Sequence, residues 1–158
     1  MALFLSTYVN RIDKKGRVSV PSQFRAALYD QAFQGVILFR SSQHECLEGF
    51  DWAYMDGLSE RLDDFDLFSD AQDDLATSIF AESHQATFDG EGRILLPVDL
   101  MEHARIIDRA AFVGLGRKFQ IWSPEALESR REEARYNVRE KGLTVPKSPG
   151  AGKGGAHG

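Results

Sequence analysis

The feature that most constrains this sequence is a nine-residue motif, Asp-x-x-Gly-Arg-x-x-x-Pro, that occurs twice. The first copy spans residues 13–21 and the second spans residues 89–97. A shift of 76 positions places one copy on the other, with Asp, Gly, Arg and Pro identical and the apolar positions matched in kind. Internal repetition of this kind predicts two structural units with the same fold.

Each copy of the motif predicts two short strands joined by a turn. In the first copy the strands are Thr7–Ile12 and Arg17–Val20. An Asp that opens such a turn accepts hydrogen bonds from the backbone N–H groups that follow it, and a Gly that closes it takes the positive φ of a bulged hairpin. We therefore expect four residues to shape the two turns: Asp13, Gly16, Asp89 and Gly92.

The segments that follow the two motifs also correspond. Proline has no N–H to donate, so it ends strand pairing and suits the first turn of a helix. A short apolar helical face comes next in each copy, followed by two strands, at 36–39 and 46–50 in the first and at 111–113 and 119–122 in the second. A unit of about 45 residues is too small for a core of its own, so we expect the two units to pack together as a pseudo-twofold barrel.

Helical segments separate and follow the two units. We expect the first unit at residues 5–52, an acidic helical insert at 53–80, the second unit at 81–124, a C-terminal helix at 125–142 and a disordered tail at 143–158. The Gly- and Pro-rich composition of the tail is typical of disorder.

Two of these helices carry N-terminal signals. Ser69 and Gln72 have the spacing of a capping box, ahead of an apolar face that includes Leu75 and Ile79. Ser123-Pro124-Glu125 predicts the start of the C-terminal helix, because Ser favours the N-cap and Pro the first helical position.

The distribution of charge is more informative than the net charge of −5. Residues 51–82 contain one basic residue, Arg61, and ten acidic ones: Asp51, Asp56, Glu60, Asp63, Asp64, Asp66, Asp70, Asp73, Asp74 and Glu82. The rest of the chain then holds 18 basic and 14 acidic residues. A local basic patch is therefore compatible with an acidic protein.

The first turn concentrates cations. Lys14, Lys15 and Arg17 lie on or beside its tip, and Arg11 is close by. Cations on such a ribbon can bind phosphates, and arginine can also contact guanine in the major groove. A solvated turn explains the same residues and is favoured by the turn alone. The repeated arginine and the segregation of charge bring the two interpretations level.

The residue types offer little support for catalysis, metal binding or a membrane span. Cys46 is the only cysteine, which we expect to be buried, and the four histidines have no metal-binding spacing. The run 63–66 lacks the Gly and the bidentate Glu of a calcium loop. A small hydrolase is disfavoured because no nucleophile motif or pair of catalytic carboxylates is present. We expect no enzymatic activity, no cofactor and no metal. No apolar run could span a bilayer and no basic segment precedes the apolar N-terminus, so we expect a cytoplasmic protein.

The repeated motif and its surroundings resemble those of a known family. Asp-x-x-Gly-Arg-x-x-x-Pro-x-x-(Phe/Leu), twice in a chain of this length, is similar to the MraZ family of bacterial transcriptional regulators, which carry tandem SpoVT-AbrB-type domains. Val9–Arg25 resembles the first signature of the family, and Ile121–Glu125 resembles the end of its second repeat. The likeness covers residues 5–135.

The resemblance implies a fold and a function. The implied fold is α+β and mainly β, a double-split, swapped-hairpin β-barrel formed by two AbrB-like repeats with flanking helices. The implied function is sequence-specific binding of double-stranded DNA, at short direct repeats in the promoter of the division and cell-wall gene cluster, by a ring-like homo-oligomer associated with the nucleoid. The DNA-contacting arginine of the family corresponds to Arg17 and, through the second motif, to Arg93.

The expected DNA-binding residues are Arg11, Lys14, Lys15, Arg17 and Arg93. The second turn, Asp89-Gly90-Glu91-Gly92-Arg93, departs from the first because it has no lysine and an additional carboxylate. Glu91 would repel phosphate, so we expect the first repeat to make most of the contacts with DNA and Arg93 to be partly structural.

A second interpretation is an AbrB-type module that acts mainly through a protein partner, as antitoxins do. It would need a C-terminal tail that folds on the partner, and the tail from Pro146 onward lacks apolar anchors.

Overall fold

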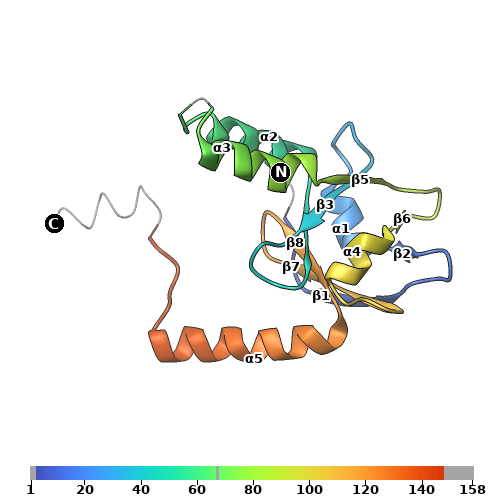
Figure 1. Cartoon of the computed structure of the whole chain (residues 1–158). Helices are drawn as coiled ribbons and strands as arrows, with labels where there is room; N and C mark the ends of the chain where they lie inside the picture. The colour runs from blue at the N-terminus through green and yellow to red at the C-terminus, as the bar shows by residue number, and fades with distance from the viewer. Residues whose placement is uncertain (1–2, 67, 148–158) are drawn as a thin grey trace. The chain divides into compact units, whose positions relative to one another are not determined.

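The strands in the described part of the chain form two antiparallel sheets (Figure 1). The computed structural model describes residues 3–66 and 68–147. Within them, six strands pair in the order β1-β7-β8-β4-β3-β5, and β2 pairs with β6. The strands are β1 Thr7–Arg11, β2 Arg17–Ser19, β3 Gly35–Arg40, β4 Leu47–Phe50, β5 His84–Thr87, β6 Arg93–Leu95, β7 Arg109–Gly114 and β8 Phe119–Trp122.

A short helix follows each motif, further helices lie between the two repeats, and a long helix follows the second repeat. They are α1 Ser22–Ala27, α2 Trp52–Leu62, α3 Asp70–Ala76, the π-helical turn η1 Thr77–Ala81, α4 Val98–His103 and α5 Pro124–Lys141. The predicted α+β, mainly β fold class with two tandem repeats is confirmed.

The two repeats exchange strands with each other. β2 of the first motif pairs with β6 of the second, with Val18 opposite Ile94 and Arg17 opposite Leu95. At the first motif the two strands are joined by an isolated bridge between Ile12 and Val18 and by a hydrogen bond of 2.8 Å from Nδ2 of Asn10 to the carbonyl of Ser19. The turn predicted between the two strands of each motif is present, but the strands form their ladders elsewhere, since β1 pairs along its length with β7 and β2 pairs with β6. This exchange is the pattern of a swapped-hairpin architecture.

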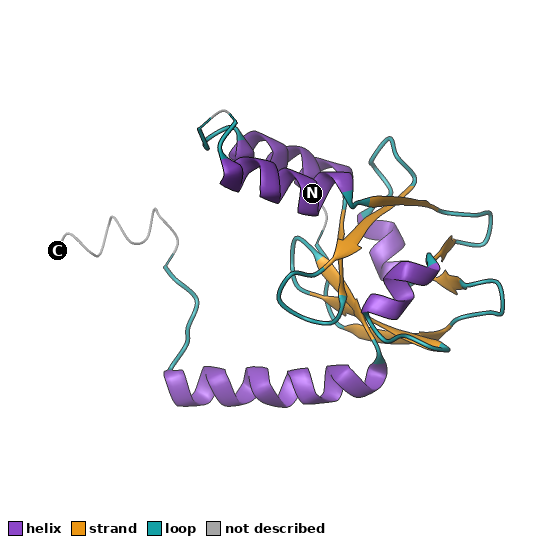
Figure 2. Ribbon diagram, viewed as in Figure 1, coloured by secondary structure: helices purple, strands orange, loops and turns teal. Residues whose placement is uncertain are grey.

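The main core lies between the concave face of the large sheet and the elements that follow each motif. Val36 and Leu38 of β3 contribute to it, together with Phe24 of α1 and Leu100 of α4. Figure 2 shows α1 and α4 against the curved sheet. An aromatic group at the centre, with ring centroids 5.1 to 5.3 Å apart, consists of Phe4, Phe24 and Phe119. Such tilted and edge-to-face contacts add to the energy of burial.

The opposite face of the sheet is covered by the helices of the middle segment. Ile37 and Phe39 of β3 point to this side, where they form a second cluster with Phe50 and Met55. Successive side chains of a strand point to opposite faces of the sheet, so the residues of β3 contribute alternately to the main core and to the second cluster. Because both faces of β3 are covered, the strand is apolar from Val36 to Phe39, which is why it could be predicted as buried.

The cap predicted for the second helix of this segment is present in part. The Oγ atom of Ser69 accepts a hydrogen bond of 3.1 Å from the backbone N–H of Gln72. The side chain of Gln72 does not reach back to Ser69; its Nε2 atom donates to the carbonyl of Leu62 instead. Gln72 thus joins α3 to the end of α2. Figure 1 shows that both helices lie far from the turns at residues 13–16 and 89–92.

The described residues from 125 to 147 belong to a second unit, separate from the first. Its helix carries ion pairs one turn apart, from Arg130 to Glu133 and from Arg131 to Glu128. Residues 143–147 have no regular secondary structure. The rest of the expected disordered tail, residues 148–158, lies outside the described residues.

Gly49 of β4 provides a test of core packing. A Cβ atom at Gly49 would lie 2.4 Å from the ring of Phe119, which is completely buried. We expect Gly49→Ala to lower the free energy of unfolding by about 1–3 kcal/mol, since the surrounding rings must shift. Denaturant unfolding, with the slope m compared between variants, measures the change.

Gly57 of α2 is the matched control. Apart from its chain neighbours and the backbone of its own helix, no heavy atom of the described residues lies within 4 Å of the position that its Cβ would take. Gly57→Ala should therefore raise the free energy of unfolding by about 0.5–1 kcal/mol through the better helix propensity of alanine. Equal stability of the two alanine variants would contradict the packing described for Gly49.

Candidate nucleic-acid interface

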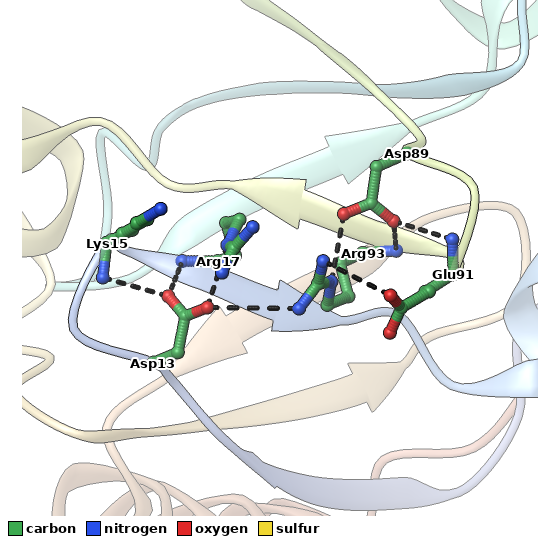
Figure 3. Close-up of polar contacts among 6 residues, drawn as sticks. All are labelled: Asp13, Lys15, Arg17, Asp89, Glu91 and Arg93. Carbon is green, nitrogen blue, oxygen red and sulfur yellow. Dashed lines mark hydrogen bonds and ion pairs between the residues drawn. The ribbon is translucent and has the colours of Figure 1, made fainter.

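The two motif turns flank the pair of strands β2 and β6 (Figure 3). Because the strands are antiparallel, the turn that precedes β2 lies at one end of the pair and the turn that precedes β6 lies at the other. Arg17 and Arg93 begin the two strands and lie between the turns. We refer to residues 13–17 and 89–93 together as the ribbon face.

Asp13 organises the first turn. Its Oδ1 atom accepts hydrogen bonds of 2.9 Å from the backbone N–H groups of Lys15 and Arg17. Its Oδ2 atom accepts a bond of 2.7 Å from Nε of Arg17. Gly16 closes the turn with a φ of 86°, and its N–H donates to the carbonyl of Asp13. One carboxylate thus fixes both the backbone of the turn and the arginine beside it.

The second turn has the same geometry. The Oδ1 atom of Asp89 accepts from the backbone N–H groups of Glu91 and Arg93, and Oδ2 accepts from Nε of Arg93, all at 2.9 Å. Gly92 closes the turn with a φ of 76°. The backbone is therefore repeated faithfully, and differences between the turns arise from their side chains.

These hydrogen bonds shift the ionisation of the groups involved. The pKa of Asp13 is lowered, chiefly by the hydrogen bond from the backbone N–H of Arg17. The pKa of Asp89 is lowered chiefly by the corresponding bond from Arg93, and the bond with Asp89 raises the pKa of Arg93. Hydrogen bonds to a charged group favour its charged form.

The two arginines differ in their surroundings. Arg93 has three carboxylates within 4 Å, those of Asp89 at 2.9 Å, Glu91 at 3.7 Å and Asp13 at 3.9 Å. Its side chain is 24% exposed. Arg17 pairs, among the described residues, with Asp13 alone, and its side chain is 35% exposed. Negative charge therefore surrounds Arg93 far more than Arg17.

Lysines add to the positive charge at the first turn. Lys14 and Lys15 are exposed, and neither takes part in an ion pair within the described residues. At the corresponding positions the second turn has Gly90 and Glu91. The ribbon face is consequently cationic at one end and balanced or acidic at the other.

Arg11 lies on β1, two residues before Asp13, and not in the turn itself. It stands directly opposite Arg109 of β7, and both residues are exposed. The positive potentials of two neighbouring cations add, so this pair strengthens the local positive potential. The repulsion between the two side chains is unfavourable for the strand pairing. Arg109 was not among the expected residues, because only the register of β1 with β7 places it there.

Arg25 is a further cation that the sequence did not indicate as part of the site. It lies on α1, and its side chain packs against Gly92, where an added Cβ would be 2.7 Å from Nε and Cζ of Arg25. Nε of Arg25 donates a hydrogen bond of 3.1 Å to the carbonyl of Val20. The position of Arg25, four residues after the end of the first motif, was a signal in the sequence. Its contact with Gly92, however, depends on the pairing of distant segments and cannot be predicted from the local sequence.

Other kinds of site find no support in the part of the chain that the structure describes. No group of three or more His, Cys, Asp or Glu side chains there is arranged to hold a metal ion. No helix there has the length and apolar character needed to cross a membrane. Cys46 is buried, as expected.

The family described as "MraZ protein, putative antitoxin-like" matches this chain at residues 3–77 and 79–142. The chain belongs to the MraZ family. The two matched regions contain one copy each of the repeated motif, so the family assignment and the internal repeat agree.

Several members of the MraZ family are similar to this chain over most of its length. A protein of Gluconacetobacter diazotrophicus is 48% identical over 99% of both chains. Another from Gluconobacter oxydans is 48% identical over 88% of this chain and 87% of its own. A third from Rickettsia felis is 43% identical over 92% of this chain and 97% of its own. Each is named Transcriptional regulator MraZ.

The ionisation of Asp13 can be tested by titration. We expect its carboxyl group, followed by NMR, to titrate below the ordinary value of about 3.9. Because the largest cause is a backbone N–H, Arg17→Leu should leave the pKa of Asp13 lowered.

The same shift has a consequence for stability. A depressed pKa in the folded state contributes stability that is present above the unfolded value and is lost as the pH falls through the folded value. The turn should therefore loosen only below about pH 4. Return of the pKa of Asp13 to its ordinary value in Arg17→Leu would show that the side chain, not the backbone, holds the carboxylate in its charged form.

Proposed function

We propose that this chain is a transcriptional regulator that binds double-stranded DNA through the ribbon face. The observation that carries the proposal is the cationic first turn, where Lys14 and Lys15 are exposed beside Arg17 and have no ion-pair partner among the described residues. The names of the three relatives agree with a role in transcription. The family's arginine corresponds to Arg17 and Arg93.

Arg17 is suited to contact DNA because its carboxylate partner uses one edge of the guanidinium group. Asp13 bonds to Nε, and within residues 3–66 and 68–147 no partner occupies the two terminal nitrogens, so they are left for an external acceptor. Arginine contacts phosphate or the O6 and N7 atoms of guanine with such pairs of N–H groups. Asp13 thus orients Arg17, and Lys14 and Lys15 supply less directional contacts to phosphates.

The acidic segment is compatible with binding of a polyanion because it is separate from the ribbon face. α2 and α3 lie far from both turns (Figure 1). At physiological ionic strength, charges separated by more than about 8 Å of solvent are largely screened from each other. The net charge of −5 therefore does not describe the potential at the first turn.

Assembly and target complete the proposal. We propose a ring-like homo-oligomer that binds short direct repeats in the promoter of the division and cell-wall gene cluster, which includes its own promoter, and that is associated with the nucleoid. Several identical faces that engage regularly spaced repeats gain affinity through effective concentration. Modest contacts at one turn are then sufficient for tight binding.

A second candidate function is action through a protein partner. The family description contains the words antitoxin-like, which favours this candidate for at least part of the family. The two candidates differ in one measurement, since only the first requires binding of the upstream DNA fragment by the isolated protein.

Arg17→Leu tests the proposal directly. We expect it to weaken binding to a fragment from the protein's own upstream region by about 1–3 kcal/mol for each productive contact. Gel shift or fluorescence anisotropy at several salt concentrations measures the loss. A contact to phosphate alone should reduce binding equally for all sequences, whereas a contact to a base should also relax discrimination between them.

Arg61→Leu on α2 is the matched control, because it removes the same charge from the acidic segment, where Arg61 lies over the ring of Tyr54. It should leave the affinity for DNA unchanged. The absence of any shift by the unaltered protein at low salt would refute the proposed function. Unchanged affinity in Arg17→Leu would refute the assignment of the site.

Glu91→Gln tests the inequality of the two turns. Removal of this carboxylate should raise the affinity for DNA at low salt, by an amount like that of one exposed ion pair, about 0.2–1 kcal/mol. The physical reason is that Glu91 lies 3.7 Å from Arg93 and would face the phosphates. Glu60→Gln on α2 is the control, and an equal gain in both variants would mean that only net charge matters.

A further inference from the structure

The strand exchange places each helix beside the turn of the other repeat. β2 runs antiparallel to β6, so the end of β2 meets the beginning of β6, and the N–H of Val20 donates to the carbonyl of Gly92. α1 starts immediately after β2 and therefore starts at the second turn. By the same geometry the N–H of Leu96 donates to the carbonyl of Gly16, so α4 starts at the first turn.

The residues that face the two turns from these helices are different. Arg25 of α1 packs on Gly92 of the second turn. The position that corresponds to Arg25 in the second repeat, 76 residues later, is Met101. Met101 lines a hollow beside the first turn together with Lys14, Lys15 and Gly16, and it packs against the main core. At matched helix positions, the second turn is therefore faced by a cation, Arg25, and the first turn by an apolar side chain, Met101.

This arrangement offsets the difference in charge between the turns. The first turn has its own lysines and needs no cation from α4, whereas the second turn has Glu91 and an arginine surrounded by carboxylates. Arg25 takes part in no ion pair within the described residues, and its bond to Val20 uses only Nε. Its two terminal nitrogens are therefore left for an external anion.

We infer that Arg25 contacts the phosphodiester backbone of DNA at the second turn, where three carboxylates surround Arg93. The inference rests on the proposed function and deepens it. The first repeat then contributes to both ends of the ribbon face, through Lys14, Lys15 and Arg17 at one end and through Arg25 at the other. Arg93 serves to hold the second turn together with Asp89.

The test compares Arg25→Met, which installs the residue of the matched position, with the unaltered full-length protein. The readout is the affinity for the upstream fragment as a function of salt concentration. A phosphate contact contributes about 1 to the slope of log K against log salt. We expect Arg25→Met to lose affinity for specific and unrelated DNA alike and to reduce the slope by about 1 for each bound subunit.

Two further variants separate charge from structure. Arg25→Lys keeps the charge without the planar group that bonds to Val20, so it should restore most of the slope. Arg61→Met on α2 should change neither the affinity nor the slope. Melting temperatures of all variants report on folding.

The outcomes decide between distinct failures. Unchanged affinity and slope in Arg25→Met would overturn the inference while leaving the proposed function intact. Equal losses in Arg25→Met and Arg25→Lys, with lowered melting temperatures in both, would also overturn it, since they would assign Arg25 to the packing of Gly92. If the unaltered protein binds no DNA, the proposed function itself fails.

Discussion

The antiparallel pairing of β2 with β6 is the interaction on which the rest of the structure depends. It joins two strands from different repeats and places Val18 and Ile94, both nearly inaccessible to solvent, opposite each other in the core. Neither repeat could bury these residues alone, because a unit of about 45 residues cannot complete its own core. The same pairing sets the separation of the two turns and decides which helix lies beside which turn.

Backbone symmetry and chemical symmetry are separate properties in this molecule. The Asp-x-x-Gly-Arg pattern builds the same turn twice, with matching hydrogen bonds to Asp13 and Asp89. The side chains between these fixed points differ, and so do the residues that approach from the helices. A duplicated fold can therefore keep its architecture while the charge of each copy changes, since the turn is held by the carboxylate, the glycine and the backbone N–H groups.

Local patterns predicted much of this fold. The repeated motif, the apolar run of β3 and the cap at Ser69 each depend on residues close together in the sequence, and each is found in the structure. The pairing of segments that are distant in the sequence was harder to predict from the sequence. The positions of Arg109 opposite Arg11 and of Arg25 on Gly92 follow from strand exchange and register, which a local pattern does not contain. The set of cations inferred from the sequence was therefore centred on the first turn.

The placement of α2 and α3 far from the turns has a consequence for motion in solution. Within residues 3–66 and 68–124, the carboxylates of the segment 51–82 and the lysines of the first turn lie in separate places, so together they give this part of the chain a dipole component directed from α2 and α3 toward the first turn. In the field of any polyanion a dipole experiences a torque. For the DNA binding proposed above, this torque would turn the first turn toward the polyanion within about a Debye length, before contact, so that a larger fraction of collisions begins in a productive orientation.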